Sequence, residues 1–184
     1  DIKTVTNKDK QEVVVSRNSK VTLTDEKGKL IEQHKVKYGS TLFVKNNTII
    51  EPGVKVAGWD PYTRPIITEV EGIVQFSDIE DGVTVMSKTD ELTGLTSIEV
   101  IDVSERPTAG KDKVPAIALV DAKGKPVTLG EHKTPANYSL PAKALVNLKN
   151  GKKLYAGEVL ARIPLEGSKT KDITGGLPRV ADLF

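Results

Sequence analysis

The stretch Ile117-Ala118-Leu119-Val120-Asp121-Ala122-Lys123-Gly124-Lys125 decides how this chain folds. Its first four residues are apolar and suit a buried strand, and the Asp-Ala-Lys-Gly that follows places a glycine where a hairpin turn needs positive φ. The stretch from Val21 to Lys29, Val-Thr-Leu-Thr-Asp-Glu-Lys-Gly-Lys, has the same pattern 96 positions earlier (117 − 21). A strand and turn that recur predict two copies of one small β module.

The repeat continues beyond this pair of strands. Leu42-Phe43-Val44 aligns with Ala144-Leu145-Val146 at an offset of 102, and Gly53 to Ala57 aligns with Gly157 to Ala161 at an offset of 104. An offset that grows slowly is what insertions in surface loops produce, because long loops cost little free energy. The growing offset therefore also supports two copies of one small β module.

Strand signals dominate the whole chain. Sustained helical periodicity is absent before Gly176, so the sequence predicts an all-β protein up to its tail. Short segments rich in Val, Ile and Thr are expected to be strands at residues 12–15, 21–25, 72–76, 83–88, 97–103 and 116–120.

Two proline-containing stretches mark breaks. Pro61 and Pro65 exclude a central strand around Trp59, because proline lacks a backbone donor, so we place a boundary there and expect Trp59 to pack where the modules meet. The predicted domains are residues 1–65, 66–166 and the tail 167–184. The first module is expected to lack a strand at its N-terminal edge and to be the less stable one. Residues 105–114 are expected to form a long exposed hairpin loop.

Composition limits the possible functions. The 184 residues include 38% apolar and 28% charged residues, and no apolar run approaches the length of a membrane span. Zero cysteines exclude disulfides and thiolate chemistry. The formal charge is +4 in residues 1–65, −3 in 66–166 and +1 in 167–184, and only eight residues are aromatic. This is a weak footprint for nucleic acid, and DNA contact by the first module stays open.

The sequence offers three candidates for a metal or phosphate site, and none has the spacing that such a site requires. His34 and His132 have no carboxylate at ligand spacing, so both are expected to be structural or solvated. The stretch from Thr108 to Lys111 lacks the first glycine and the final hydroxyl of a phosphate-binding loop. The acidic run of Asp78, Glu80 and Asp81, with Asp90 and Glu91 nearby, does not have calcium-loop spacing. We expect no catalytic residue, metal or cofactor in this chain.

Lys27 and Lys123 raise an alternative. Biotin- and lipoyl-carrier domains are small β sandwiches that present a modified lysine at a hairpin tip, and both lysines stand at predicted tips. Their contexts, Asp-Glu-Lys-Gly and Asp-Ala-Lys-Gly, depart from the carrier motifs. The turn itself accounts for each Lys-Gly pair.

The tail has a different character. Gly175 and Gly176 read as a hinge, and Pro178 suits the first position of a helix. Leu177, Val180, Ala181 and Phe184 then share one apolar face, which predicts a short C-terminal helical segment. Because no stop signal follows and the chain begins at Asp1, we expect a piece of something larger.

Thr170 to Phe184 closely resembles the segment that follows the trigger loop in the beta-prime subunit of bacterial DNA-directed RNA polymerase. The preceding residues resemble the large insertion that some bacterial lineages carry in that loop, through Trp59 to Val70, Thr89 to Leu95 and Leu160 to Pro164. The resemblance implies two tandem sandwich-barrel hybrid modules. The residues that match the start of the second trigger-loop arm are Thr174, Gly175, Gly176, Leu177, Pro178 and Arg179.

The resemblance also implies a function. The whole enzyme performs DNA-templated nucleotidyl transfer with magnesium and zinc, in the cytoplasm, and its partners are the beta, alpha, omega and sigma subunits, with downstream DNA as a further candidate and no membrane. The family's metal ligands lie outside these positions, so the insertion is expected to modulate trigger-loop folding, pausing, elongation and transcript cleavage. The alternative is a free-standing β-sandwich module that binds protein partners through exposed sheet edges.

Overall fold

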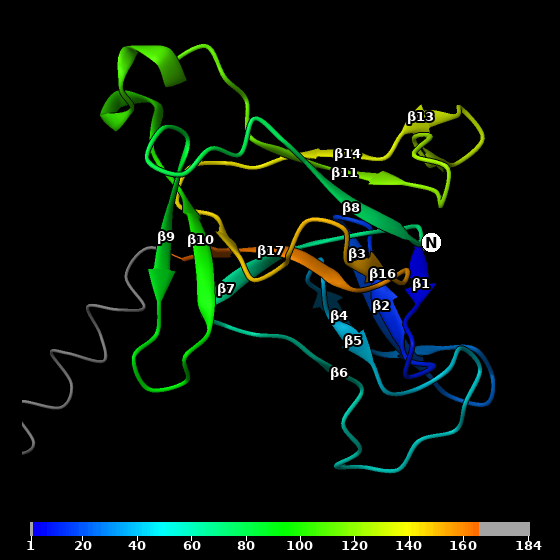
Figure 1. Cartoon of the computed structure of the whole chain (residues 1–184). Coiled ribbons are helices and arrows are strands. Elements are labelled where there is room, and N and C mark those ends of the chain that lie inside the picture. The colour runs from blue at the N-terminus through cyan, green and yellow to red at the C-terminus, as the bar shows by residue number, and fades with distance from the viewer. Residues whose placement is uncertain (1, 166–184) are drawn as a thin grey trace, which may run out of the picture.

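A computed structural model describes residues 2–165, and these residues are almost entirely β-structure (Figure 1). The expected all-β class is confirmed. The two short helical elements in this range are the 3-10 turns η1 (Val103–Glu105) and η2 (Thr108–Gly110). The strands are β1 Thr4–Thr6, β2 Glu12–Val14, β3 Ser19–Thr24, β4 Leu30–Val36, β5 Thr41–Leu42, β6 Ala57–Gly58, β7 Thr63–Ile67, β8 Gly72–Ser77, β9 Val85–Thr89, β10 Thr96–Val100, β11 Ala116–Val120, β12 Thr128–Leu129, β13 Thr134–Pro135, β14 Asn137–Ser139, β15 Leu145–Val146, β16 Lys153–Leu154 and β17 Val159–Pro164.

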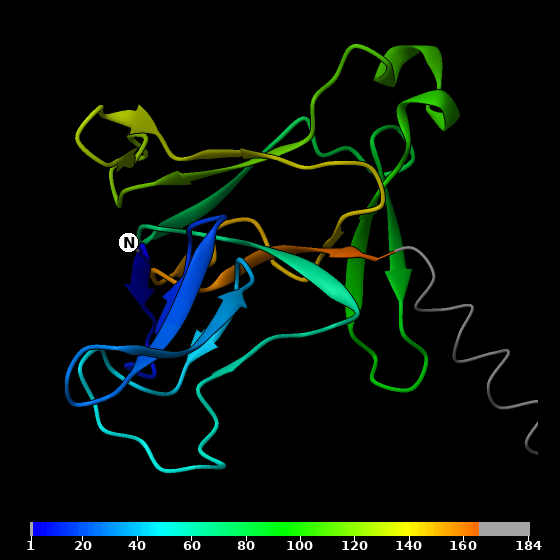
Figure 2. The same cartoon turned by 180° about the vertical axis from the view of Figure 1, so that it is seen from behind.

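The strands form two groups, here called the first half (β1 to β6) and the second half (β7 to β17). The first half has a four-stranded sheet in the order β1-β2-β5-β6 and the two-stranded hairpin β3-β4. The second half has a five-stranded sheet, β7-β17-β15-β10-β9, a four-stranded sheet, β14-β11-β8-β16, and the small pair β12-β13. Figure 2 shows the two groups from behind, with the tip of the β9-β10 hairpin projecting from the second half.

The second half contains the main core. Apolar residues of both larger sheets meet there, among them Val74, Val100, Ile117, Leu119 and Leu160, each 1% exposed or less. Burial of such side chains stabilises the fold by about 1.5–3 kcal/mol each. The predicted segments supply Val74, Val100, Ile117 and Leu119, whereas Leu160 lies in β17, which the sequence did not predict as a strand.

The sequence repeat is also a structural repeat. The order β1-β2-β5-β6 matches β9-β10-β15-β17, and the contacts agree in detail. The Val14 N–H donates to the Ser40 carbonyl at 2.9 Å, and the Val100 N–H donates to the Ala144 carbonyl at 3.0 Å. Ser40 thus corresponds to Ala144, an offset of 104, so the offset of 102 expected for this strand from the sequence is wrong by two residues. A slip of two keeps each side chain on its face, which is why the apolar pattern did not detect it.

The turns of the repeat have the same geometry. The Asp25 carboxylate accepts hydrogen bonds from the N–H groups of Lys27 and Lys29, and the Asp121 carboxylate accepts the same pair from Lys123 and Lys125. The glycine of each turn has φ near +78°. The turn chemistry read from the sequence is confirmed.

Residues 105–114 do not form the expected hairpin loop. They connect β10 of one sheet to β11 of the other through η1 and η2. Arg106 is buried, and its guanidinium donates to the carbonyls of Ile101 and Lys113 at 2.9 Å. A buried cation that binds backbone carbonyls folds the segment back on itself, an outcome that alternating charges and one proline do not reveal.

Candidate interaction groove between the two halves

The two halves are joined through the side chain of Tyr38, which follows β4. The backbone N–H of Ile67, in β7, donates to the Tyr38 hydroxyl at 3.2 Å, and the hydroxyl lies 3.4 Å from the Ile67 carbonyl oxygen. Burial of the ring raises the pKa of Tyr38. The hydroxyl therefore remains protonated and satisfies backbone groups of an otherwise buried residue.

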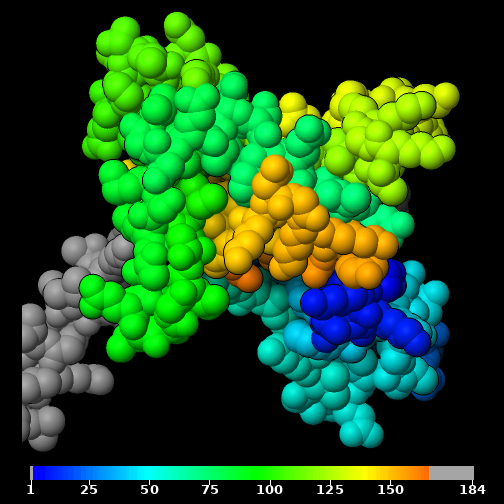
Figure 3. Space-filling model, in the orientation of Figure 1, coloured from blue at the N-terminus to red at the C-terminus, as the bar shows by residue number. Residues whose placement is uncertain are grey.

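A small second core surrounds this contact. Val13 and Val15 of the first half pack with Ile67, and Val5, Tyr38 and Val159 lie around them. Gly39 has φ +83°, and a Cβ there would lie 2.4 Å from the Pro65 Cγ. The halves thus share apolar surface and approach each other at a glycine. Figure 3 shows the blue N-terminal residues directly against the orange residues near β17.

Ion pairs reinforce the junction at its rim. The Lys3 Nζ lies 2.5 Å from a Glu69 carboxylate oxygen, which raises the pKa of Lys3 through that hydrogen bond, and the Lys8 Nζ lies 3.4 Å from Glu158. Exposed pairs of this kind contribute little each. The apolar contacts therefore provide most of the stability of the junction.

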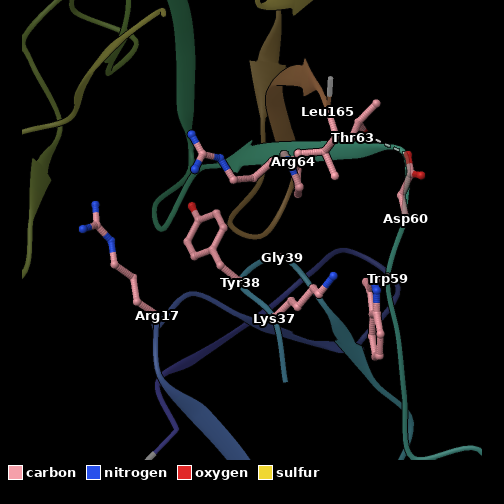
Figure 4. Close-up of a pocket in the computed structure, with 10 residues that line it drawn as sticks. Arg17, Lys37, Tyr38, Gly39, Trp59, Asp60, Thr63, Arg64 and Leu165 are labelled. Carbon is pink, nitrogen blue, oxygen red and sulfur yellow. Dashed lines mark hydrogen bonds between the residues drawn. The ribbon is translucent and has the colours of Figure 1, made fainter. Parts of the chain in front are cut away.

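A groove of about 320 Å³ opens beside this junction (Figure 4). Its walls come from both halves, and Tyr38 stands between Arg17 and Arg64 in the close-up, while Lys37 points toward Trp59. A second hollow of about 420 Å³ shares Gly39, Trp59, Asp60 and Pro65 with it and extends toward Phe43 and Lys55. The lining of the first hollow is Arg17, Lys37, Tyr38, Gly39, Trp59, Asp60, Thr63, Arg64, Pro65 and Leu165.

The groove is cationic. Arg17, Lys37 and Arg64 contribute three positive charges, against the single carboxylate of Asp60. That carboxylate accepts from the Thr63 hydroxyl at 2.6 Å and the Tyr62 N–H at 2.8 Å, and Arg162 lies 3.7 Å away. These bonds, the Thr63 one foremost, lower the pKa of Asp60. Because the Asp60 carboxylate already binds Thr63, Tyr62 and Arg162, the cations of the groove suit an anionic partner.

Aromatic rings line the same surface. Trp59 is 46% exposed, with the Lys37 Nζ 5.6 Å from its ring centroid, and the Lys55 Nζ lies 4.8 Å from that of Phe43. Trp59 is at the junction as expected, but the packing there comes from Tyr38. An exposed tryptophan beside cations is typical of a recognition surface.

The candidates rejected from the sequence have structural explanations. Glu80 pairs with Lys113, the Asp81 carboxylate accepts from the Ser87 N–H at 2.9 Å, and Asp78 accepts from the Val114 N–H at 3.2 Å. These carboxylates therefore stabilise turns and loops through hydrogen bonds and an ion pair. Within residues 2–165 no group of His, Cys, Asp and Glu is arranged to hold a metal ion.

The two histidines and the two tip lysines lie apart from the groove. His34 contacts Glu32 at 2.9 Å on the exposed face of β4, and His132 is exposed in the turn between β12 and β13. Lys27 and Lys123 are exposed at their turns. The hinge residues Thr174, Gly175, Gly176, Leu177, Pro178 and Arg179, and the expected C-terminal helical segment, lie outside the described residues.

Sequence reasoning missed the groove itself. Its cations are separated by up to 47 positions in the chain, so no local motif exists. One signal was available in the sequence: a Tyr-Gly pair, Tyr38-Gly39, lies just after the alternating strand around His34, and glycine permits the positive φ that Gly39 adopts in the structure. Among the described residues no helix is long and apolar enough to cross a bilayer.

The described residues form an all-β segment with a cationic groove between its two halves. No known family profile matches the chain. Over its full length, however, it is 53% identical to the DNA-directed RNA polymerase subunit beta′ of Pseudomonas aeruginosa and 51% identical to those of Cellvibrio japonicus and Chromohalobacter salexigens. It spans about 13% of the length of these relatives. Over its full length the chain therefore corresponds to one segment of the DNA-directed RNA polymerase beta′ subunits that it resembles.

Proposed function

We propose that this chain is a non-catalytic insertion in the trigger loop of a beta′ subunit and that it modulates DNA-templated RNA synthesis. The observation that carries the proposal is the full-length match to a small part of the beta′ relatives. The resemblance of Thr170 to Phe184 to the second trigger-loop arm supports the location. In this proposal the whole enzyme, a cytoplasmic nucleotidyltransferase, supplies the magnesium and zinc chemistry.

The proposed mechanism is mechanical. A trigger loop that folds and unfolds at each nucleotide addition moves any body attached to it. If the insertion contacts another subunit or downstream DNA more favourably in one state, it shifts the ratio of states. A difference of about 1.4 kcal/mol changes that ratio tenfold.

The groove supplies a surface for such a contact. Tyr38, Ile67 and the shared core hold the two halves together, so a force applied at the groove reaches the whole body. Arg17, Lys37 and Arg64 favour an acidic surface of the polymerase or the DNA backbone. The groove is the first place to seek the contact that distinguishes the states.

The test compares the intact polymerase with one in which residues 1–165 are replaced by a short flexible linker. We expect altered pause lifetimes, elongation rates and transcript cleavage rates, with the catalytic metal requirement unchanged. Unchanged pausing and cleavage would refute the modulating role.

A finer version tests the groove. The triple variant Arg17→Ala, Lys37→Ala, Arg64→Ala removes its cations, and Lys27→Ala, Lys29→Ala, Lys123→Ala removes the same charge from exposed turns. The groove variant should reproduce part of the effect of the linker, while the turn variant should behave like the parent. Equal effects would point to net charge instead of this surface.

A further inference from the structure

One strand of the first half lacks a neighbour that its counterpart has. In β11, Ile117 lies opposite Tyr138 of β14, and in β3, Val21 lies opposite His34 of β4. β11 also pairs on its other side with β8, where Ile117 lies opposite Phe76. β3 pairs with β4 alone among the described strands. The edge of β3 that faces away from β4 therefore corresponds to the edge of β11 that pairs with β8 in the second half.

The backbone groups at this edge follow from strand alternation. The Asp25 N–H donates toward the β4 side, to the Lys29 carbonyl at 2.9 Å. Because N–H and C=O groups of successive residues point to opposite edges, those of Lys20 and Thr22 point away from β4. Their counterparts in β11, Ala116 and Ala118, lie opposite Ser77 and Gln75 of β8.

The segment that corresponds to β16, the other neighbour of β8, is also unpaired in the first half. In the second half, β8 also pairs with β16, where Lys153 lies opposite Ile73. The counterparts of Lys153 and Leu154 at the offset of 104 are Ile49 and Ile50, which belong to no strand. Gly53 and Gly157, at φ +87° and +82°, confirm the same offset just beyond. The loop that carries Ile49 projects from the body in both views (Figures 1 and 2).

Burial differs in the way that a missing strand predicts. Ile117, Leu119 and Leu154 are 1% exposed or less. Their counterparts Val21, Leu23 and Ile50 are only half-buried. Apolar residues on an open edge invite another strand.

We propose that an extended strand, antiparallel to β3, occupies the space between β3 and Ile49-Ile50, and that the polypeptide directly preceding β1 in the intact subunit supplies it. The chain order of the repeat identifies the source, because β8 precedes β9, the counterpart of β1. The strand has alternating apolar residues, as β8 has in Val74 and Phe76. The inference rests on the proposed function in one respect, that the chain is part of a longer subunit.

Amide hydrogen exchange tests the proposal. The chain is compared with the same chain extended at its N-terminus by the residues that precede Asp1 in its subunit. We expect the extension to slow exchange of the Lys20 and Thr22 amides about tenfold or more, toward the protection of Ala118. The Val21 amide, which already faces β4, should change less. Unchanged exchange at Lys20 and Thr22 would overturn the proposal.

Two proline variants give an independent readout. Thr22 and Gln33 lie opposite each other in the β3-β4 pair, with N–H groups that point away from each other. Thr22→Pro faces the proposed strand and Gln33→Pro faces the outer edge of β4. In the extended chain Thr22→Pro should lower the urea midpoint more than Gln33→Pro, and in the shorter chain the two should be equal. Equal shifts in both chains would contradict the assignment.

Other occupants give different results. Protection of Thr22 that appears in the shorter chain and grows with protein concentration would indicate a second copy at this edge and would overturn the assigned source. The pausing assay is separate: unchanged pausing with protected Lys20 and Thr22 amides removes the modulating role and leaves the strand in place.

Discussion

The N–H of Ile67 donates to the hydroxyl of Tyr38 at 3.2 Å, and this single side chain joins β7 to the segment that follows β4. Ile67 is 2% exposed, so solvent does not replace the hydroxyl when it is lost. The contact links residues 29 positions apart and is one of the contacts, with the shared apolar core, that hold the two halves together.

Removal of that hydroxyl should destabilise the protein. Tyr38→Phe keeps the ring but leaves the Ile67 N–H without its partner, and we expect a loss of about 1–3 kcal/mol in the free energy of unfolding. Urea denaturation followed by circular dichroism measures it. Tyr62→Phe is the control, because Tyr62 is 56% exposed, and it should change stability little. Equal effects of the two variants would argue against the junction role of Tyr38.

Gly39 and Gly28 form a matched pair for the close approach. Both have positive φ, +83° and +78°, but a Cβ at Gly39 would lie 2.4 Å from the Pro65 Cγ, whereas a Cβ at Gly28 has nothing within 4 Å. Gly28→Ala should cost about 1–2 kcal/mol from backbone strain alone. Gly39→Ala should cost clearly more and should loosen the junction, measured as faster amide exchange in β7. Similar costs would mean that Pro65 moves aside freely.

Arg106 should resist replacement by other long side chains. Its guanidinium donates to two carbonyls at 2.9 Å, and Arg106 is 6% exposed. Arg106→Met leaves these carbonyls without the donor and should destabilise the protein by about 1–3 kcal/mol. Arg106→Lys should recover only part of the lost stability, because a lysine ammonium lacks the planar, forked donor geometry of the guanidinium. Thermal unfolding compares the three proteins, and full rescue by lysine would show that charge alone suffices.

The Asp60 carboxylate should make stability depend on acid. Its hydrogen bonds, first that from the Thr63 hydroxyl, lower its pKa below the ordinary 3.8. A carboxyl with a lowered folded pKa contributes stability that is present above the unfolded pKa and is lost as pH falls through the folded pKa. The difference in unfolding midpoint between the parent and Asp60→Asn should therefore be constant above about pH 5 and shrink below pH 3.8. A pH-independent difference would contradict the assignment.

The sequence by itself determined the local chemistry of this protein. The Val, Ile and Thr segments predicted four strands of the core, β8, β9, β10 and β11, and the Asp-x-Lys-Gly turns predicted two identical turns, because strand preference and turn geometry depend on neighbouring residues. The repeat was visible for the same reason.

Tertiary structure alone decided the rest. The offset of 104 at Ser40 and Ala144, the fold of residues 105–114 around Arg106 and the cationic groove all depend on contacts between residues far apart in the chain. A two-residue slip preserves the apolar pattern, and a buried arginine has the same sequence signal as an exposed one. Arg17 and Arg64 line one groove only when the halves pack. Such contacts are set by the packing of whole sheets, and no short window of sequence contains them.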